Sequence, residues 1–245
     1  MNLCQRGLLR AQTNALKVIV PELDPEPPLT RGAQPIGDGY VLLTAHDEEE
    51  RLVRDVMQIN ALINFFTQHG KPERISDGKF SLERWARLCL PNGQIARCAW
   101  KEIENGLTRN SRNVKFRDDG STHFGEVLYY FQTKIVNEEK EPLGTYAMVS
   151  VYGKADANLL SKSSHTLRII HYKGSEDLRI IKAKSITSVV ALFPFILSDD
   201  EKKNPNICAQ YLQSFFVGEK PFLDFTTNTT DPSQEDIEEA GASAE

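Results

Sequence analysis

The stretch HFGEVLYYFQTKIV, from His123 to Val136, decides the fold class because it is rich in β-branched and aromatic residues. That composition, with an apolar period near two, predicts a β-strand. Five more stretches share this character and are separated by polar turns, at residues 113–117, 145–153, 165–174, 178–183 and 185–195. No segment of crossover-helix length lies between them, which argues against a parallel sheet. The sequence therefore predicts an antiparallel sheet or a small barrel.

A helix is predicted ahead of this β-rich half. Thr44 or Asp47 can cap it, and the acids of DEEE at residues 47–50 suit a helix N-terminus. Apolar residues then recur at spacings of four, three, four and three, at Leu52, Val56, Ile59, Ile63 and Phe66. This single stripe indicates a helix that packs on its own domain. The alternative is a short coiled-coil seam between copies of the chain.

Two shorter helices are predicted at residues 81–90 and 94–106, the first stopped by Pro91-Asn92-Gly93 and the second by Asn105-Gly106. The predicted fold class is therefore α+β, with a helical N-terminal part followed by an antiparallel sheet or a small barrel of the SH3 or bromo-adjacent-homology type. Four parts are expected along the chain: a flexible segment with a Pro-rich linker (1–43), a helical subdomain (44–110), an antiparallel β domain (111–226) and a disordered acidic tail (227–245).

Composition narrows the class of protein. The chain has 245 residues and a net charge of −5, so any nucleic-acid binding must come from a local patch. The four cysteines form no C-x-x-C pair, and we expect no metal site and no cofactor. No stretch approaches the roughly 20 apolar residues of a membrane helix, so no membrane partner is expected. We expect an intracellular protein, in the nucleus or the cytoplasm.

The sequence shows no recognisable catalytic motif. The five histidines lie outside any familiar catalytic context, and G-x-S-x-G, P-loop, G-x-G-x-x-G and H-E-x-x-H motifs are all missing. Asp118-Asp119 and Asp199-Asp200 occur in polar runs, where aspartate is a good turn former rather than a magnesium ligand. We therefore assign no catalytic residue and expect a protein that is not an enzyme.

A local excess of positive charge is the best candidate for a binding site. Between residues 84 and 117 eight basic residues face only two acids, Glu102 and Glu104, which gives a balance of +6. The eight are Arg84, Arg87, Arg97, Lys101, Arg109, Arg112, Lys115 and Arg117. We interpret them as contacts to nucleic-acid phosphate, with Trp85 or Trp100 available to stack on a base. The alternatives are docking of an acidic partner or of the chain's own tail, and a solvated face with both tryptophans in the core.

Several blocks between Phe80 and Phe225 carry a resemblance. RWARLCLPNGQIARCAWKE, RNVKF, FGEVLYYF, AMVSVYG, SITSVVALFPF and FFVGEKPFLDF occur in this order. Together they resemble the C-terminal region of cut-and-paste transposases of basidiomycete fungi, of the CACTA kind. The resemblance implies a non-catalytic accessory module of a transposon protein, whose partners are DNA and a transposase or chromatin protein. The acids that perform strand transfer would lie upstream, so no catalytic residue is carried over.

The expected strand order is also similar to that of chromatin-reader barrels of the bromo-adjacent-homology type. A methyl-lysine cage needs several converging aromatic rings, and candidates are Tyr129, Tyr130, Phe131, Tyr146 and Tyr152. Alternation along a strand sends neighbours to opposite faces, so at least half of them should be core. The sequence as a whole predicts a non-catalytic binding module that contacts nucleic acid. The alternative is a protein–protein assembly domain, with a helical seam or a peptide-binding barrel.

Overall fold

The structure, a computed structural model, describes residues 31–43, 51–69, 80–104, 110–133 and 144–219, and the single residues Gln12, Leu16, Leu29 and Gly106. The chain divides into two compact units, Met1–Ala33 and Gln34–Glu245. Only the second unit has enough described residues for an account of its fold. The acidic tail predicted at 227–245 lies outside the described residues, as does most of the segment predicted at 1–43.

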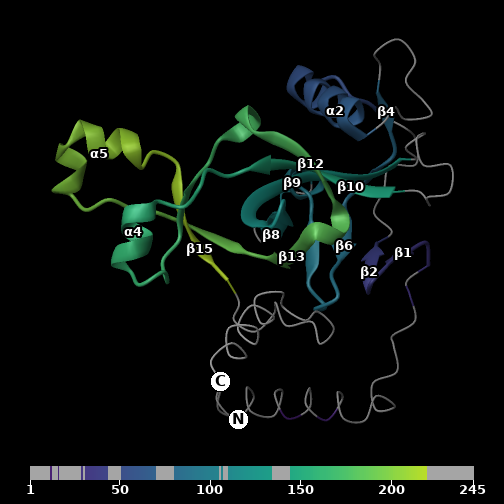
Figure 1. The fold of residues 1–245 in the computed structure, drawn as a ribbon, viewed down its shortest axis with the longest axis horizontal. Coiled ribbons are helices and arrows are strands. Elements are labelled where there is room, and N and C mark those ends of the chain that lie inside the picture. The colour runs from purple at the N-terminus through teal and green to yellow at the C-terminus, as the bar shows by residue number, and fades with distance from the viewer. Residues whose placement is uncertain are drawn as a thin grey trace, which may run out of the picture. The chain divides into compact units, whose positions relative to one another are not determined.

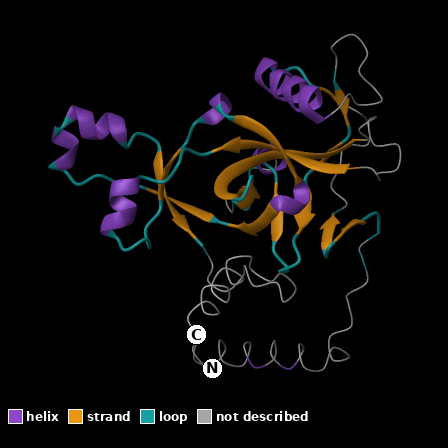
Figure 2. Ribbon diagram, in the orientation of Figure 1, coloured by secondary structure: helices purple, strands orange, loops and turns teal. Residues whose placement is uncertain are grey.

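Antiparallel sheets dominate the second unit (Figures 1 and 2). The largest has the strand order β12 (Leu178–Lys182), β10 (Gly144–Val151), β9 (Ser121–Thr133), β8 (Asn113–Asp118) and β13 (Ile186–Val189), with β5 (Arg84–Trp85) added to β9. A second sheet has the order β1 (Gln34–Gly37), β2 (Tyr40–Leu42), β6 (Arg87–Cys89) and β7 (Ile95–Arg97). The strands β11 (Ile169–His171), β15 (Ser214–Gly218) and β14 (Ala191–Pro194) form a third sheet, and β3 (Arg51–Leu52) pairs with β4 (Ser81–Leu82).

Apart from α2 (Val56–His69), the described helices are short. The other described α-helices are α3 (Ala99–Glu104), α4 (Ala157–Lys162) and α5 (Pro205–Gln210). Single 3₁₀ turns occur at η2 (Gly174–Glu176), η3 (Ala183–Ser185) and η4 (Glu201–Lys203). None of the described helices is long and apolar enough to cross a membrane.

A β-bulge in β9 decides which side chains share a face of the large sheet. The pairing of β9 with β10 shifts between Met148 and Val149, which leaves Leu128 as an extra residue. The extra residue shifts by one position which side chains of the strand point to each face of the sheet. Val127 and Tyr130, three residues apart, therefore join the same core cluster, although strict alternation would have separated them.

The two faces of the large sheet bury different partners. On one face, Val127, Tyr130 and Ala147 pack against the second sheet through Leu42, Leu88 and Ala96. On the other face, Tyr129, Phe131 and Met148 pack against α2 through Leu62, Phe65 and Phe66. A third, smaller cluster of Phe124, Tyr152, Ile170 and Val190 holds the three-stranded sheet. Gly125 allows the close packing of β9 on β10, because a Cβ there would lie 2.3 Å from a methyl carbon of Val149.

The predicted fold class is wrong, because the N-terminal part is not a helical subdomain. Residues 81–97, where one helix and the start of another were expected, form β4, β5, β6 and β7. The reason is visible in burial: Leu88 and Leu90, two residues apart, are both almost fully buried, as strand residues on one face are. The Pro-Asn-Gly run does not end a helix but makes a hairpin turn, with Gly93 at φ +76°.

The predicted small barrel is wrong as well. The described strands fall into separate sheets, and the largest of them ends in two edges, β12 and β13, with no ladder between them. Residues 34–42, expected as linker and approach to a helix, form the β1–β2 hairpin instead. Antiparallel pairing itself is confirmed, since every strand pair of the described residues is antiparallel.

The predicted apolar stripe belongs only in part to one helix. α2 begins at Val56, and the carboxylate of Asp55 caps it by accepting from the N–H groups of Met57 at 2.8 Å and Gln58 at 3.1 Å. Leu52 lies in β3, and the cap residues expected at 44 and 47 lie outside the described residues. The helix packs on its own domain through Phe66 together with Leu62 and Phe65, whereas Val56 and Ile63 are exposed.

Candidate functional site

The turn at residues 91–94 serves the fold rather than a ligand. The side-chain amide of Asn92 donates to the Thr187 carbonyl oxygen at 3.0 Å. Gln94 accepts from the N–H of Val189 at 2.9 Å, and its own amide donates to the Val189 carbonyl at 3.4 Å. These bonds occupy backbone groups along the outer edge of β13. The turn thus attaches the second sheet to the large one and covers an edge that would otherwise be open.

Three of the eight predicted site residues are neutralised by carboxylates. Lys101 pairs with Glu104 at 2.7 Å, and Lys115 pairs with Glu219 at 2.8 Å. Arg112 lies between Glu126 and Glu102, at 2.5 and 3.4 Å. Their positive charge is therefore largely balanced within the molecule, and the sequence count of +6 overstates the field at the surface.

Arg84 is engaged by aromatic rings. Its guanidinium carbon lies 4.4 Å from the centroid of Trp100 and 5.6 Å from that of Tyr129, which are cation–π distances. The ammonium of Lys101 lies 5.0 Å from the same Trp100 ring. Trp85 is only 4% exposed. Both tryptophans are thus used inside the fold, and base stacking by either one has no support from this arrangement.

Arg87 and Arg97 lie together on the outer face of the second sheet. They are directly opposite each other in the β6–β7 hairpin, and the neighbouring pair of Leu88 and Ala96 points into the core. Neither arginine has an ion pair among the described residues, and the Nε atom of Arg87 is buried without a hydrogen-bond partner there. Both arginines are partly buried, and neither is balanced by a carboxylate among the described residues.

Of the remaining two predicted residues, Arg117 does not extend that surface. Arg117 is exposed at the far end of β8, beside the β8–β9 turn, and lines a different feature, described below. Arg109 lies outside the described residues. The structure therefore brings Arg87 and Arg97 together and separates them from Arg117 in the fold.

Arg112 is the centre of a buried polar network at the start of β8. The side chains of Glu102 and Glu126 are only 1% and 10% exposed. Glu102 also accepts from the backbone N–H of Ser111 at 2.7 Å, and Glu126 accepts from the Tyr172 hydroxyl at 3.2 Å. Two buried carboxylates thus share one guanidinium, and each carboxylate also accepts a hydrogen bond from a neutral donor.

A pocket of about 470 Å³ opens over this network. Tyr152, Tyr172 and Phe215 line it, and the Tyr152 hydroxyl donates to Asn113 at 2.9 Å. Burial, with the nearby Glu126 carboxylate, raises the pKa of Tyr152 and of Tyr172 above the ordinary tyrosine range. Both hydroxyls therefore remain donors at neutral pH, which suits a structural network better than proton transfer. No sequence signal had distinguished Tyr172 or Phe215 from other strand residues.

The aromatic residues considered for a methyl-lysine cage are core residues. Tyr129, Tyr130, Phe131, Tyr146 and Tyr152 are each at most 8% exposed. Regular strand alternation distributes the first three over the two faces of the sheet, where they pack in separate clusters. This set of rings therefore does not converge on an open site.

The polar groups that could support catalysis are dispersed in the described part of the chain. No three His, Cys, Asp or Glu side chains gather there in a way that could hold a metal ion. Asp118 is ion-paired to Arg179. Asp119 and Gly120 form the turn of the β8–β9 hairpin, and these two residues have positive φ. Burial raises the pKa of the Cys98 thiol to about 11, so it stays protonated at neutral pH.

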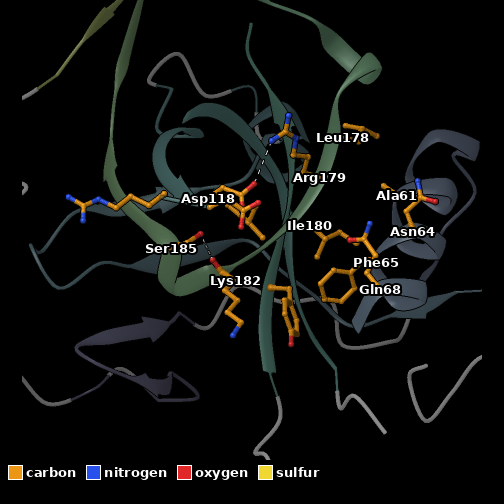
Figure 3. A pocket seen from close by; sticks show the side chains of 14 residues that line it. Ala61, Asn64, Phe65, Gln68, Asp118, Leu178, Arg179, Ile180, Lys182 and Ser185 are labelled. Atoms are coloured by element: carbon orange, nitrogen blue, oxygen red, sulfur yellow. Dashed lines mark hydrogen bonds and ion pairs between the residues drawn. The ribbon is translucent and has the colours of Figure 1, made fainter. Parts of the chain in front are cut away.

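A groove of about 620 Å³ runs beside β12. Ala61, Asn64 and Gln68 of α2 line one side of it, and Asp118 from the β8–β9 turn lies on the other side (Figure 3). Residues 178–182, the whole of β12, contribute to its lining. Sequence reasoning had not indicated this groove, because it depends on where α2 packs against the sheet.

Comparisons of the chain with protein-family models, with curated proteins and with solved structures find no match. The resemblance to a transposase module therefore stays a prediction, and function must be inferred from the geometry described above.

Proposed function

We propose that this chain is a non-catalytic binding module that contacts nucleic-acid phosphate through Arg87 and Arg97. The observation that carries the proposal is their placement directly opposite each other on the outer face of the β6–β7 hairpin, without an ion pair among the described residues. Arginine presents several N–H donors in a planar fork, which matches the oxygens of a phosphate.

The physical argument is that this pair is unfavourable until an anion arrives. Two like charges directly opposite in an antiparallel pair destabilise it. A guanidinium Nε buried without a partner, as in Arg87, adds a further cost. A phosphate between the two guanidinium groups would relieve the repulsion and accept from their terminal N–H groups. Among the other described basic residues of this stretch, Lys101, Arg112 and Lys115 are paired with carboxylates, and Arg84 lies over aromatic rings. Arg117 has no ion pair among the described residues.

A salt series with paired variants tests the proposal. Binding of a mixed-sequence DNA duplex is measured by fluorescence anisotropy at several salt concentrations, for the wild type and for Arg87→Glu/Arg97→Glu. The expected result is loss of binding in the variant, because two phosphate contacts are reversed. The control is Lys154→Glu/Lys162→Glu, which makes the same change of net charge at two exposed lysines on other segments. Equal loss in both variants would show that only bulk charge matters and would refute the site.

We also propose, on the sequence resemblance alone, that the module derives from a fungal transposon protein and acts with DNA in the nucleus. The genomic neighbourhood tests the origin. A transposase core and terminal repeats flanking the gene are expected, and a neighbourhood without either would contradict it.

A further inference from the structure

The strand β12 has a free edge. On one side it pairs with β10 in the register Tyr146 with Lys182 through Ser150 with Leu178. No strand among the described residues pairs with its other side. The N–H of Val151 donates to the Asp177 carbonyl at 2.8 Å, so positions 177, 179 and 181 point their backbone groups toward β10. Leu178 and Ile180 therefore direct their N–H and C=O groups to the open side, as Lys182 does its N–H, whereas the Lys182 carbonyl already accepts from the Ser185 hydroxyl at 2.8 Å.

The groove beside this edge has the dimensions of an extended peptide. Its volume of about 620 Å³ and its contact with all five residues of β12 leave room for a segment of about five residues paired along the strand. Asn64 and Gln68 of α2 stand at its wall and supply amide groups for the side chains of such a segment (Figure 3). Added strands gain affinity from backbone hydrogen bonds and specificity from neighbouring side chains.

The charges at the groove favour an acidic occupant. Arg179 is balanced by Asp177 at 2.9 Å and by Asp118 at 3.5 Å. Arg117 and Lys182 also line the groove, and neither has an ion pair within the described residues. Over the lining as a whole, three cations (Arg117, Arg179 and Lys182) face two carboxylates (Asp118 and Asp119), and Asp177, which is not part of the lining, is shared between Arg179 and Lys173. The unbalanced charge at the groove is therefore positive.

We propose that this groove binds an extended acidic peptide segment of a partner protein, which adds as a strand to the free edge of β12. The site is separate from Arg87 and Arg97, and the proposal does not depend on nucleic-acid binding. A second copy of the chain is disfavoured as the occupant, because edge-to-edge pairing of two β12 strands would place two Arg117 and two Lys182 side chains in one interface.

Two labelled octapeptides test the proposal, one alternating threonine with glutamate and the other alternating threonine with lysine. Fluorescence polarisation with the full chain is expected to show binding of the glutamate peptide only. Backbone amide shifts on adding that peptide should concentrate on β12 and α2. Equal binding of both peptides, no binding of either, or shifts away from β12 would overturn the proposal.

Lys182 offers a matched pair of variants. Its φ is −63°, which proline adopts without strain, and its N–H points away from β10. Lys182→Pro removes the charge and the outward N–H and is expected to weaken peptide binding by about tenfold. Lys182→Gln removes the charge alone and is expected to weaken it by about threefold. Equal effects would mean that no backbone hydrogen bond forms at this edge. If Lys182→Pro does not fold, the backbone amide shifts of the wild type on adding the glutamate peptide decide whether the segment lies along β12.

Two further outcomes would assign the groove to another occupant. A full-length variant with the acids at 231, 235, 236, 238 and 239 changed to amides should bind the glutamate peptide as the wild type does. Tenfold tighter binding would show that the chain's own tail fills the groove and would overturn the partner segment. A concentration-dependent dimer in sedimentation that Lys182→Pro dissolves would overturn it in favour of a second copy.

Discussion

The start of β8 and the β6–β7 hairpin use arginine in opposite ways. At the start of β8, Arg112 is held between two buried carboxylates, Glu102 and Glu126. On the hairpin, Arg87 and Arg97 face each other without an ion pair among the described residues. In the sequence these residues look alike, since all belong to one basic run. The difference teaches that a count of charges predicts a surface only after the carboxylates brought in by the fold are subtracted.

Removing Arg112 should have the largest effect. Arg112→Ala leaves two buried carboxylates without their guanidinium, which should lower the free energy of unfolding by about 3–5 kcal/mol. Urea denaturation followed by tryptophan fluorescence measures this loss. The control Arg112→Lys keeps the charge but not the two-sided contact, so an intermediate loss is expected. A variant as stable as the wild type would show that the network contributes nothing to the fold.

Disruption of the turn that joins the two sheets should have the next largest effect on stability. Gln94→Ala removes both hydrogen bonds to Val189 and should lower the free energy of unfolding by about 1–2 kcal/mol. Gln94→Glu keeps the acceptor for the Val189 N–H, and about half of that loss is expected. If the two substitutions cost the same in urea denaturation, the bond to the Val189 N–H is not the one that matters.

The hairpin arginines should show the reverse pattern, with little effect on stability. Arg97→Ala removes one of two opposed like charges, so the free energy of unfolding should stay within about 0.5 kcal/mol of the wild type or rise slightly. The same variant should bind DNA with a salt slope shallower by about one. A clear loss of stability, with DNA binding unchanged, would place Arg97 with Arg112 as a structural residue.

Lys101 should show the smallest effect of all. Its pair with Glu104 is solvent-exposed, with both side chains at least 38% accessible. Lys101→Ala is therefore expected to change the free energy of unfolding by at most about 0.5 kcal/mol. A loss of several kcal/mol would mean that its position over the Trp100 ring, rather than the ion pair, carries its role.

The sequence predicted the antiparallel strands of residues 113–195 well, because alternating β-branched and aromatic residues report on pairing directly. It failed at residues 81–97, where Leu88 and Leu90 alternate over too few positions to be told from a helical stripe. It also failed at Arg112, since Glu126 reaches that guanidinium, and Tyr172 reaches Glu126, only through long-range packing. Local patterns thus predicted strands, but they carried no information on which charges the fold would pair.

The slope of DNA affinity against salt for the unmodified chain tests the central claim most directly. Each phosphate contact contributes about −0.9 to the slope of log K against log salt. Two contacts, from Arg87 and Arg97, predict a slope of about −2. A slope near −7, as expected if all eight basic residues touched phosphate, or a slope near zero would contradict the account.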